Sequence, residues 1–127
     1  MAQSCYVMGD IDRLYRAISN LITNAIQYTL ADGIVTIRLD YLDNLAIITI
    51  QDTGIGIDLA DLAHIFDRFY RVQGDRARIS GGTGLGLAIV QAIVRSYHGT
   101  INVSSRVDQG SVFTVKFPAF IRRSRVS

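Results

Sequence analysis

The sequence contains no glutamate, and Lys116 is its only lysine, so its acidic side chains are all aspartates and its basic ones almost all arginines. Its single cysteine, Cys5, cannot form an internal disulfide, which fits a reducing compartment. No Gly-Lys-Ser or Gly-Lys-Thr occurs anywhere in the chain. This absence excludes a phosphate-binding P-loop.

Long hydrophobic runs are also missing. The longest stretch without a charged residue, from Ile79 to Val94, contains four glycines and falls short of the apolar length that crosses a bilayer. The residues after Met1 lack the basic-then-apolar pattern of an export signal. We therefore expect a cytoplasmic domain that does not itself contact a membrane.

The composition favours one folded domain. The chain has 127 residues, of which 49% are hydrophobic and 19% charged, and this balance argues against intrinsic disorder. A net charge of +2 is too small to indicate nucleic-acid binding. We expect a domain over residues 1–118, monomeric in isolation, followed by a basic, disordered tail over residues 119–127.

Hydrophobic periodicity divides the chain into helices and strands. The predicted elements are a short strand at Cys5–Met8, a helix at Asp10–Thr29, strands at Ile34–Leu39 and Leu45–Ile50, a short helix at Asp58–Ile65, a long helix at Leu85–Tyr97, and strands at Ile101–Ser105 and Val112–Phe117. Turn residues at Asp43-Asn44 and Asp108-Gln109-Gly110 close two hairpins, and the polar segment 74–82 predicts a mobile loop. The predicted fold class is an α/β (α+β) two-layer sandwich, a mixed β-sheet covered on one face by about three helices.

Three amide side chains lie along one side of the first predicted helix. Asn20 and Asn24 are one turn apart, and Gln27 continues the line. Ordinary polar-face residues would give the same pattern, but amide oxygens can also ligate Mg²⁺, a cation that prefers oxygen ligands and commonly binds phosphates. Asp10 or Asp12 can cap the start of this helix.

The segment Asp52-Thr-Gly-Ile-Gly-Ile57 directly follows a predicted buried strand. Aspartate and glycine mark ordinary turns, so this motif is weak evidence when taken alone. A carboxylate at the end of a strand can also accept a hydrogen bond from the exocyclic amine of adenine. It would reject guanine, which presents an oxygen at that place.

A glycine-rich segment, Gly81-Gly-Thr-Gly-Leu-Gly86, leads into the second long helix. The free backbone N–H groups and the dipole at a helix start favour a bound anion, and phosphate is the natural candidate. A dinucleotide-binding loop is not favoured, because the residues before the glycines are polar and arginine-rich and do not form a strand.

The order and spacing of these motifs resemble the catalytic domains of sensor histidine kinases. The similar segments are the N box Asn20-Leu-Ile-Thr-Asn-Ala-Ile-Gln-Tyr-Thr29, the G1 box Asp52-Thr-Gly-Ile-Gly56, the F box Phe66-Asp-Arg-Phe-Tyr-Arg71, the G2 box Gly82-Thr-Gly-Leu-Gly86 and a last glycine box at Gly110-Ser111. The resemblance covers about residues 6–118. It implies the Bergerat ATP-binding fold, which gyrase-type and mismatch-repair ATPases share.

The resemblance also implies which residues act. Asn24, with Asn20 beside it, would ligate Mg²⁺, and Asp52 would hold adenine. Arg71 would reach the phosphates and, with the two asparagines, forms the implied catalytic set. The other implied ATP-binding residues are Gln27, Tyr28, Gly54, Gly56, Ile57, Gly82, Thr83, Gly84, Leu85 and Gly86, with Gly82, Gly84 and Gly86 as hinges of an ATP lid. Gln27 departs from the family pattern, in which lysine or arginine is common at this place.

The implied function is phosphotransfer. The chain would bind Mg·ATP and donate the γ-phosphate to a histidine on a separate dimerisation domain of the same kinase. The parent kinase can be membrane-anchored, and a response regulator would be an indirect partner. In the family's acceptor motif an acidic residue and then a proline follow the histidine. Neither His64 nor His98 has this context, so we interpret both as structural.

Three alternatives stay open. A gyrase-type ATPase of the same fold would use a glutamate where this chain has Asn20, so its hydrolysis should be slow here. An ATP-sensing or degenerate kinase would bind nucleotide without transfer, and Gln27 allows that reading. The third alternative is a related serine kinase that acts on a regulatory protein.

Overall fold

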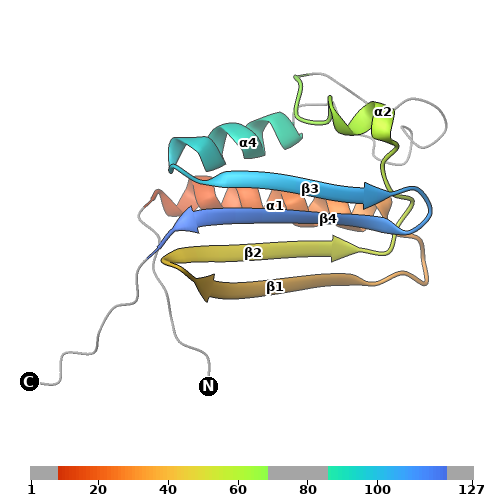
Figure 1. Ribbon diagram of the computed structural model, residues 1–127, viewed down its shortest axis with the longest axis horizontal. Helices are drawn as coiled ribbons and strands as arrows, with labels where there is room; N and C mark the ends of the chain where they lie inside the picture. Colours follow the sequence, from red (N-terminus) through yellow and green to blue (C-terminus); the bar gives the residue numbers. More distant parts are fainter. Residues whose placement is uncertain (1–8, 69–85, 120–127) are drawn as a thin grey trace, which may run out of the picture.

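The computed structural model describes residues 9–68 and 86–119, which form two layers (Figure 1). The elements in order are α1 (Ile11–Tyr28), β1 (Val35–Leu42), β2 (Leu45–Asp52), α2 (Leu59–Leu62), α4 (Gly86–Ser96), β3 (Thr100–Arg106) and β4 (Gly110–Pro118). Helices α1 and α4 lie on one face of the sheet. The predicted α/β sandwich is confirmed, whereas the strand at Cys5–Met8, the loop 74–82 and the tail after residue 119 fall outside the described residues.

The four described strands have the order β1-β2-β4-β3. Each neighbouring pair is antiparallel. A helical crossover joins β2 to β3, and these two strands run in the same direction, but β4 lies between them. The mixed character that we predicted for the sheet therefore has no counterpart in the strands that the structure describes.

Helix α1 confirms the strongest prediction made from periodicity. Asp10, not Asp12, is its N-cap, and the Asp10 side chain accepts a hydrogen bond from the backbone N–H of Asp12 at 2.9 Å. The buried residues of the helix are Ala17, Leu21 and Ala25. The two alanines are small enough to let α1 pack closely against its neighbours, so one narrow stripe is enough to hold it on the sheet.

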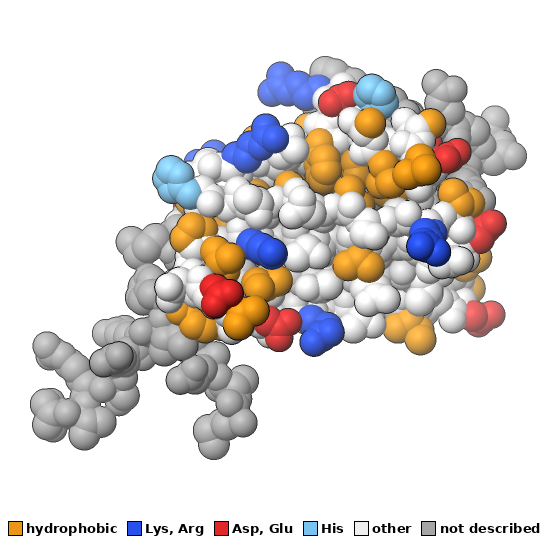
Figure 2. Space-filling view, viewed as in Figure 1, with side chains coloured by type: hydrophobic (Ala, Val, Ile, Leu, Met, Phe, Trp, Pro, Cys, Tyr) orange, Lys and Arg blue, Asp and Glu red, His pale blue; other side chains and the backbone are white. Residues whose placement is uncertain are grey.

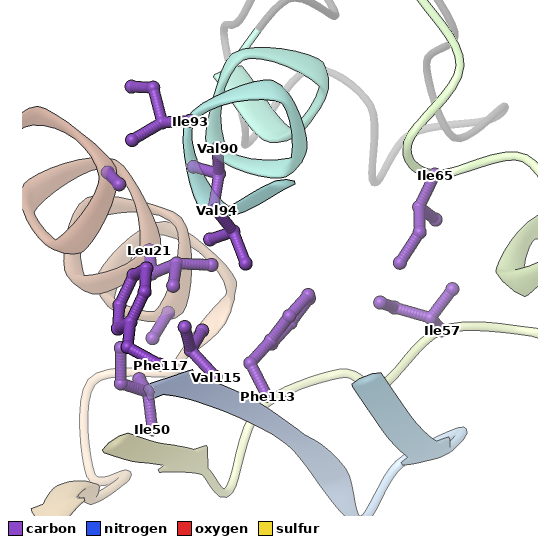
Figure 3. Close-up of a cluster of buried hydrophobic side chains, with 12 residues drawn as sticks. Leu21, Ile50, Ile57, Ile65, Val90, Ile93, Val94, Phe113, Val115 and Phe117 are labelled. Carbon is purple, nitrogen blue, oxygen red and sulfur yellow. The ribbon is translucent and has the colours of Figure 1, made fainter. Parts of the chain in front are cut away.

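The core lies between the helices and the sheet (Figure 3). Its largest fully buried side chains are Phe113, Phe117, Leu21, Ile50, Val90, Val94 and Val115. Phe113 also meets the ring of Phe66 edge to face, with 6.5 Å between ring centroids. Burying a side chain of this size contributes about 1.5–3 kcal/mol. The strand that supplies Phe113, Val115 and Phe117 is thus the centre of the fold.

Both predicted hairpins are confirmed, and their turns use left-handed backbone. Asp43 and Asn44 have φ of 54° and 63°, as a two-residue type I′ turn requires. The turn between β3 and β4 places Asp108 at φ 65°. Helix α4 ends in the same way, with His98 at φ 62° and the N–H of Gly99 donating to the Val94 carbonyl at 2.9 Å.

Strand β1 lies at the edge of the sheet, and its inner face is largely open. Ile37 and Leu39 stand opposite Ile50 and Ile48 of β2, so they point to the helix side, yet they are 51% and 67% exposed. Exposed apolar residues of α1, namely Ile11, Tyr15 and Ile26, share one side of that helix. We call these five residues the open apolar surface.

The other face of the sheet is more polar. In Figure 2, which has the same view as Figure 1, uncharged polar side chains and backbone cover most of the strands and the charged side chains are scattered.

No helix within residues 9–68 and 86–119 is long and apolar enough to cross a membrane.

Candidate functional site

Several of the predicted site residues lie at one edge of the molecule. Helix α1 ends there at Tyr28, strand β2 ends there at Asp52, and the turn between β3 and β4 lies at the same edge (Figure 1). The end of α1 and the β3–β4 turn, which are far apart in the sequence, therefore both contact the turn that follows Asp52.

Asp52 is the buried charge of this edge, with only 3% of its surface exposed. Its Oδ1 accepts the backbone N–H of Gly54 at 2.9 Å, and the backbone N–H of Ser111 also donates to the carboxyl group. Burial raises the pKa of Asp52 above its usual value, and these two hydrogen bonds offset only part of that rise. The carboxylate is fixed in direction and holds lone pairs that a further donor can use.

Gly54 lies against the end of α1. A Cβ at this position would overlap the carbonyl of Tyr28, which also accepts the N–H of Ile55 at 3.1 Å. A glycine is thus required here for packing of the chain on itself. The resemblance implied an ATP-binding role for Gly54, and the structure adds a reason for this glycine that needs no ligand.

Gly56 and Gly110 lie on the opposite side of the same turn. Gly56 has φ 74°, and a Cβ there would overlap the carbonyl of Arg106. Gly110 has φ 117°, and its Cβ would overlap the carbonyl of Asp52. The turn after Asp52 is therefore wedged between the end of α1 and the β3–β4 hairpin.

Ser105 is a site residue that the sequence reasoning missed. Its hydroxyl accepts the backbone N–H of Ile57 at 2.7 Å and lies 2.7 Å from the hydroxyl of Ser111. Alternation along β3 places Ser105 on the same inner face as Ile101 and Val103, and this was the only sequence signal. That signal gave no indication of the contact with a turn 48 residues away.

The predicted amides lie on α1 before Tyr28. Asn20 and Asn24 are half-buried, and Gln27 is exposed. Within the described ranges no hydrogen bond joins either asparagine carboxamide to another residue. Half-buried amides with free capacity fit the ligation of a cation. Carboxylates, cysteines and histidines form no metal-binding group in the part of the chain that the structure describes.

Comparison with known proteins decides the family. Residues 9–121 match the family model described as histidine kinase-, DNA gyrase B-, and HSP90-like ATPase. The chain belongs to this family. It is 54% identical over 115 residues to the sensor histidine kinase RppB of Synechocystis and 39% identical over 119 residues to the sensor histidine kinase CusS of Escherichia coli K12.

The coverage of these matches is unequal. The alignments include 91% and 94% of this chain but 25% of each relative, so the chain spans about a quarter of their length. Among solved structures, the mycobacterial sensor histidine kinase MprB has a TM-score of 0.81 at 30% identity, over 94% of this chain and 79% of that one. The catalytic domain of histidine kinase ThkA has a TM-score of 0.74 at 27% identity, over 88% of this chain and 70% of that one.

Several implied family residues cannot be placed. Arg71, Gly82, Thr83, Gly84 and Leu85 lie outside the described residues. Gly86 is the first residue of α4, so the connection from the glycine-rich segment into a helix is confirmed. A Cβ at Gly86 would meet no other atom of the described residues within 4 Å.

The two histidines have local structural partners. His64 Nδ1 lies 2.9 Å from Asp67 Oδ2, in a pair whose side chains are both more than half exposed. His98 occupies the left-handed position that ends α4. His98 is thus confirmed as a helix-end residue, and His64 as a surface residue.

Proposed function

We propose that this chain binds Mg·ATP at the edge formed by α1, β2 and the β3–β4 turn, and donates the γ-phosphate to a histidine on a separate helical domain. The observation that carries the proposal is the buried, directionally fixed carboxylate of Asp52. The turn after Asp52 packs on the end of α1, the helix that carries the free amides, in a chain that belongs to the histidine kinase-like ATPases.

Asp52 would recognise adenine. Two backbone N–H groups already orient its carboxylate, and a lone pair remains for the exocyclic amine of the base. Guanine presents an oxygen acceptor at that place, and an acceptor opposite a buried carboxylate is strongly disfavoured. Gly54, Gly56 and Ile57 form the turn beside this carboxylate, and Tyr28 would line the nucleotide.

Asn24 and Asn20 would hold Mg²⁺ together with the phosphates. The bound ion would supply positive charge that offsets the charge of the triphosphate during transfer. Arg71 is predicted to add a second positive group. Gln27 is exposed and uncharged, so it contributes no such charge. The described residues thus bind and orient the nucleotide, and the nucleophile comes from the partner domain.

The partners follow from this division of work. We propose that the acceptor histidine lies on a dimerisation domain of the same kinase and that a response regulator receives the phosphoryl group. Hydrolysis of ATP by water should be slow compared with transfer to the histidine, because the chain has no glutamate to act as a general base where Asn20 stands. The site would act in the cytoplasm, whether or not the longer protein is anchored in a membrane.

Phosphotransfer with γ-labelled ATP tests the proposal. Incubation with the purified histidine domain should give acid-labile, base-stable label on that partner and little on this chain. Asp52→Asn should weaken ATP binding by about 1–3 kcal/mol, the scale of a buried hydrogen bond to a charged group. Asp40→Asn, on an exposed strand position, is the matched control and should bind as the unmodified chain does.

Two outcomes would contradict the proposal. The first is stable label on His64 or His98 in the absence of a partner. The second is equal affinity of the unmodified chain for ATP and GTP.

A further inference from the structure

The hydroxyl of Ser105 uses its full hydrogen-bonding capacity inside the site. It accepts the N–H of Ile57 at 2.7 Å, lies 2.7 Å from the Ser111 hydroxyl, and lies 3.0 Å from the Gly110 carbonyl oxygen. A serine hydroxyl has one proton and two lone pairs. All three contacts are satisfied together when Ser105 donates to Gly110 and accepts from Ile57 and Ser111.

These contacts lie on both sides of Asp52. Ile57 belongs to the turn that follows Asp52, and Ser111 stands opposite Asp52 in the sheet and donates its backbone N–H to the carboxyl group. A backbone bond from Asp108 to the Ile55 carbonyl, 2.8 Å long, holds the same turn. Ser105 therefore supplies the side chain that ties the turn after Asp52 to the strand beside it.

Packing alone does not explain a serine at this place. Along the inner face of β3, Ile101 and Val103 pack against the core, and Ser105 is next in the alternation. A hydrophobic residue there would bury more apolar surface, whereas the serine leaves a polar group beside the core. The hydrogen bonds to Ile57, Gly110 and Ser111 are what this residue adds.

We propose that Ser105 is a positioning residue for base selectivity, an inference that rests on the proposed adenine-binding role of Asp52. Ser105 does not touch the nucleotide. It fixes the Ile57 backbone and Ser111, and so fixes the direction in which Asp52 offers its free lone pair. Recognition of an amine by one carboxylate depends on alignment within a few tenths of an ångström, so loosening this support reduces selectivity.

The test compares four variants with the unmodified chain. Ser105→Ala removes the hydroxyl, Ser105→Thr keeps it, and Ser105→Val has the shape of threonine without the hydroxyl. Ser104→Ala is the matched control, because Ser104 is exposed on the other face of β3. Dissociation constants for ATP and GTP are measured by calorimetry at a temperature at which circular dichroism shows each variant folded.

Loss of the hydroxyl should raise the dissociation constant for ATP about tenfold and that for GTP much less, so the preference for ATP falls. Ser105→Thr and Ser104→Ala should keep the preference of the unmodified chain. If Ser105→Ala does not fold, the threonine and valine variants decide, since they differ only in the hydroxyl group.

An unchanged ATP preference in folded Ser105→Ala or Ser105→Val would overturn the inference, even if their melting temperatures fall. Equal loss of preference in Ser105→Thr and Ser105→Val would also overturn it. In either case the proposed function still holds if the unmodified chain prefers ATP to GTP. Absence of ATP preference in the unmodified chain is a different result, which contradicts the proposed function itself.

Discussion

At the scale of the single residue, the raised pKa of Asp52 makes the stability of the domain depend on pH. Its pKa is raised by burial, so the folded domain holds the proton more tightly than the unfolded chain does. Its contribution to the free energy of unfolding therefore falls as the pH rises from the ordinary pKa of aspartate through the raised pKa of Asp52. The ionised carboxylate of Asp52 thus lowers the stability of the domain at neutral pH.

Asp52→Asn removes this titration. We expect the melting temperature of the variant, relative to that of the unmodified chain, to rise between about pH 4 and about pH 7, because only the unmodified chain must keep a buried charge. Thermal unfolding without nucleotide at several pH values measures this difference. A difference that stays constant or falls with pH contradicts the sign. Asp40→Asn serves as the control, since Asp40 is exposed.

Asn24 is predicted to act through the metal. Asn24→Ala should reduce the part of the ATP affinity that depends on Mg²⁺ and leave the helix intact, because alanine is the best helix former. Affinities measured in Mg²⁺ and in EDTA separate the two parts. Thr23→Ala, at an exposed neighbouring position, is the control. An equal loss of affinity in Mg²⁺ and in EDTA would rule out the ligand role.

At the scale of the element, the end of α4 carries avoidable strain. His98 has φ 62°, a conformation that costs a residue with a Cβ about 1–2 kcal/mol and that glycine adopts freely. His98→Gly should stabilise the domain by about 1 kcal/mol. Urea unfolding measures the gain. His98→Ala keeps the strained backbone and should show no gain, so an equal effect of the two substitutions would locate the cause elsewhere.

At the scale of the whole molecule, the open apolar surface shows that hydrophobic residues at paired positions of the sheet can differ widely in burial. Ile37 is 51% exposed, and its partner Ile50 in the sheet is completely buried. Ile37→Thr should leave stability nearly unchanged and lower self-association at high concentration, because it reduces an exposed apolar patch. Ile50→Thr should cost about 2–5 kcal/mol. Light scattering and urea unfolding measure the two effects, and a similar loss of stability in both variants contradicts this reading.

The sequence predicted the elements whose signals are local. Helix α1 has a one-sided apolar stripe, and Asp43-Asn44 is a turn that tolerates left-handed backbone, so both could be found within a few residues. The extension of β1 to Leu42 could not, because it depends on pairing with Leu45. The packing reason for Gly54 and the role of Ser105 were also hidden, since each arises from contact with a distant segment.

Both ends of the described chain lie at the edge opposite the site. The backbone N–H of Asp10 is bonded to the hydroxyl of Tyr97 at 2.8 Å, and that of Ala119 to the carbonyl of Asn44 at 2.9 Å. The full length of β2 separates Asn44 from Asp52. A tether or fluorescent reporter joined at residue 9 or at residue 119 therefore lies far from the edge that carries Asp52, which suits the domain to immobilisation on a sensor surface.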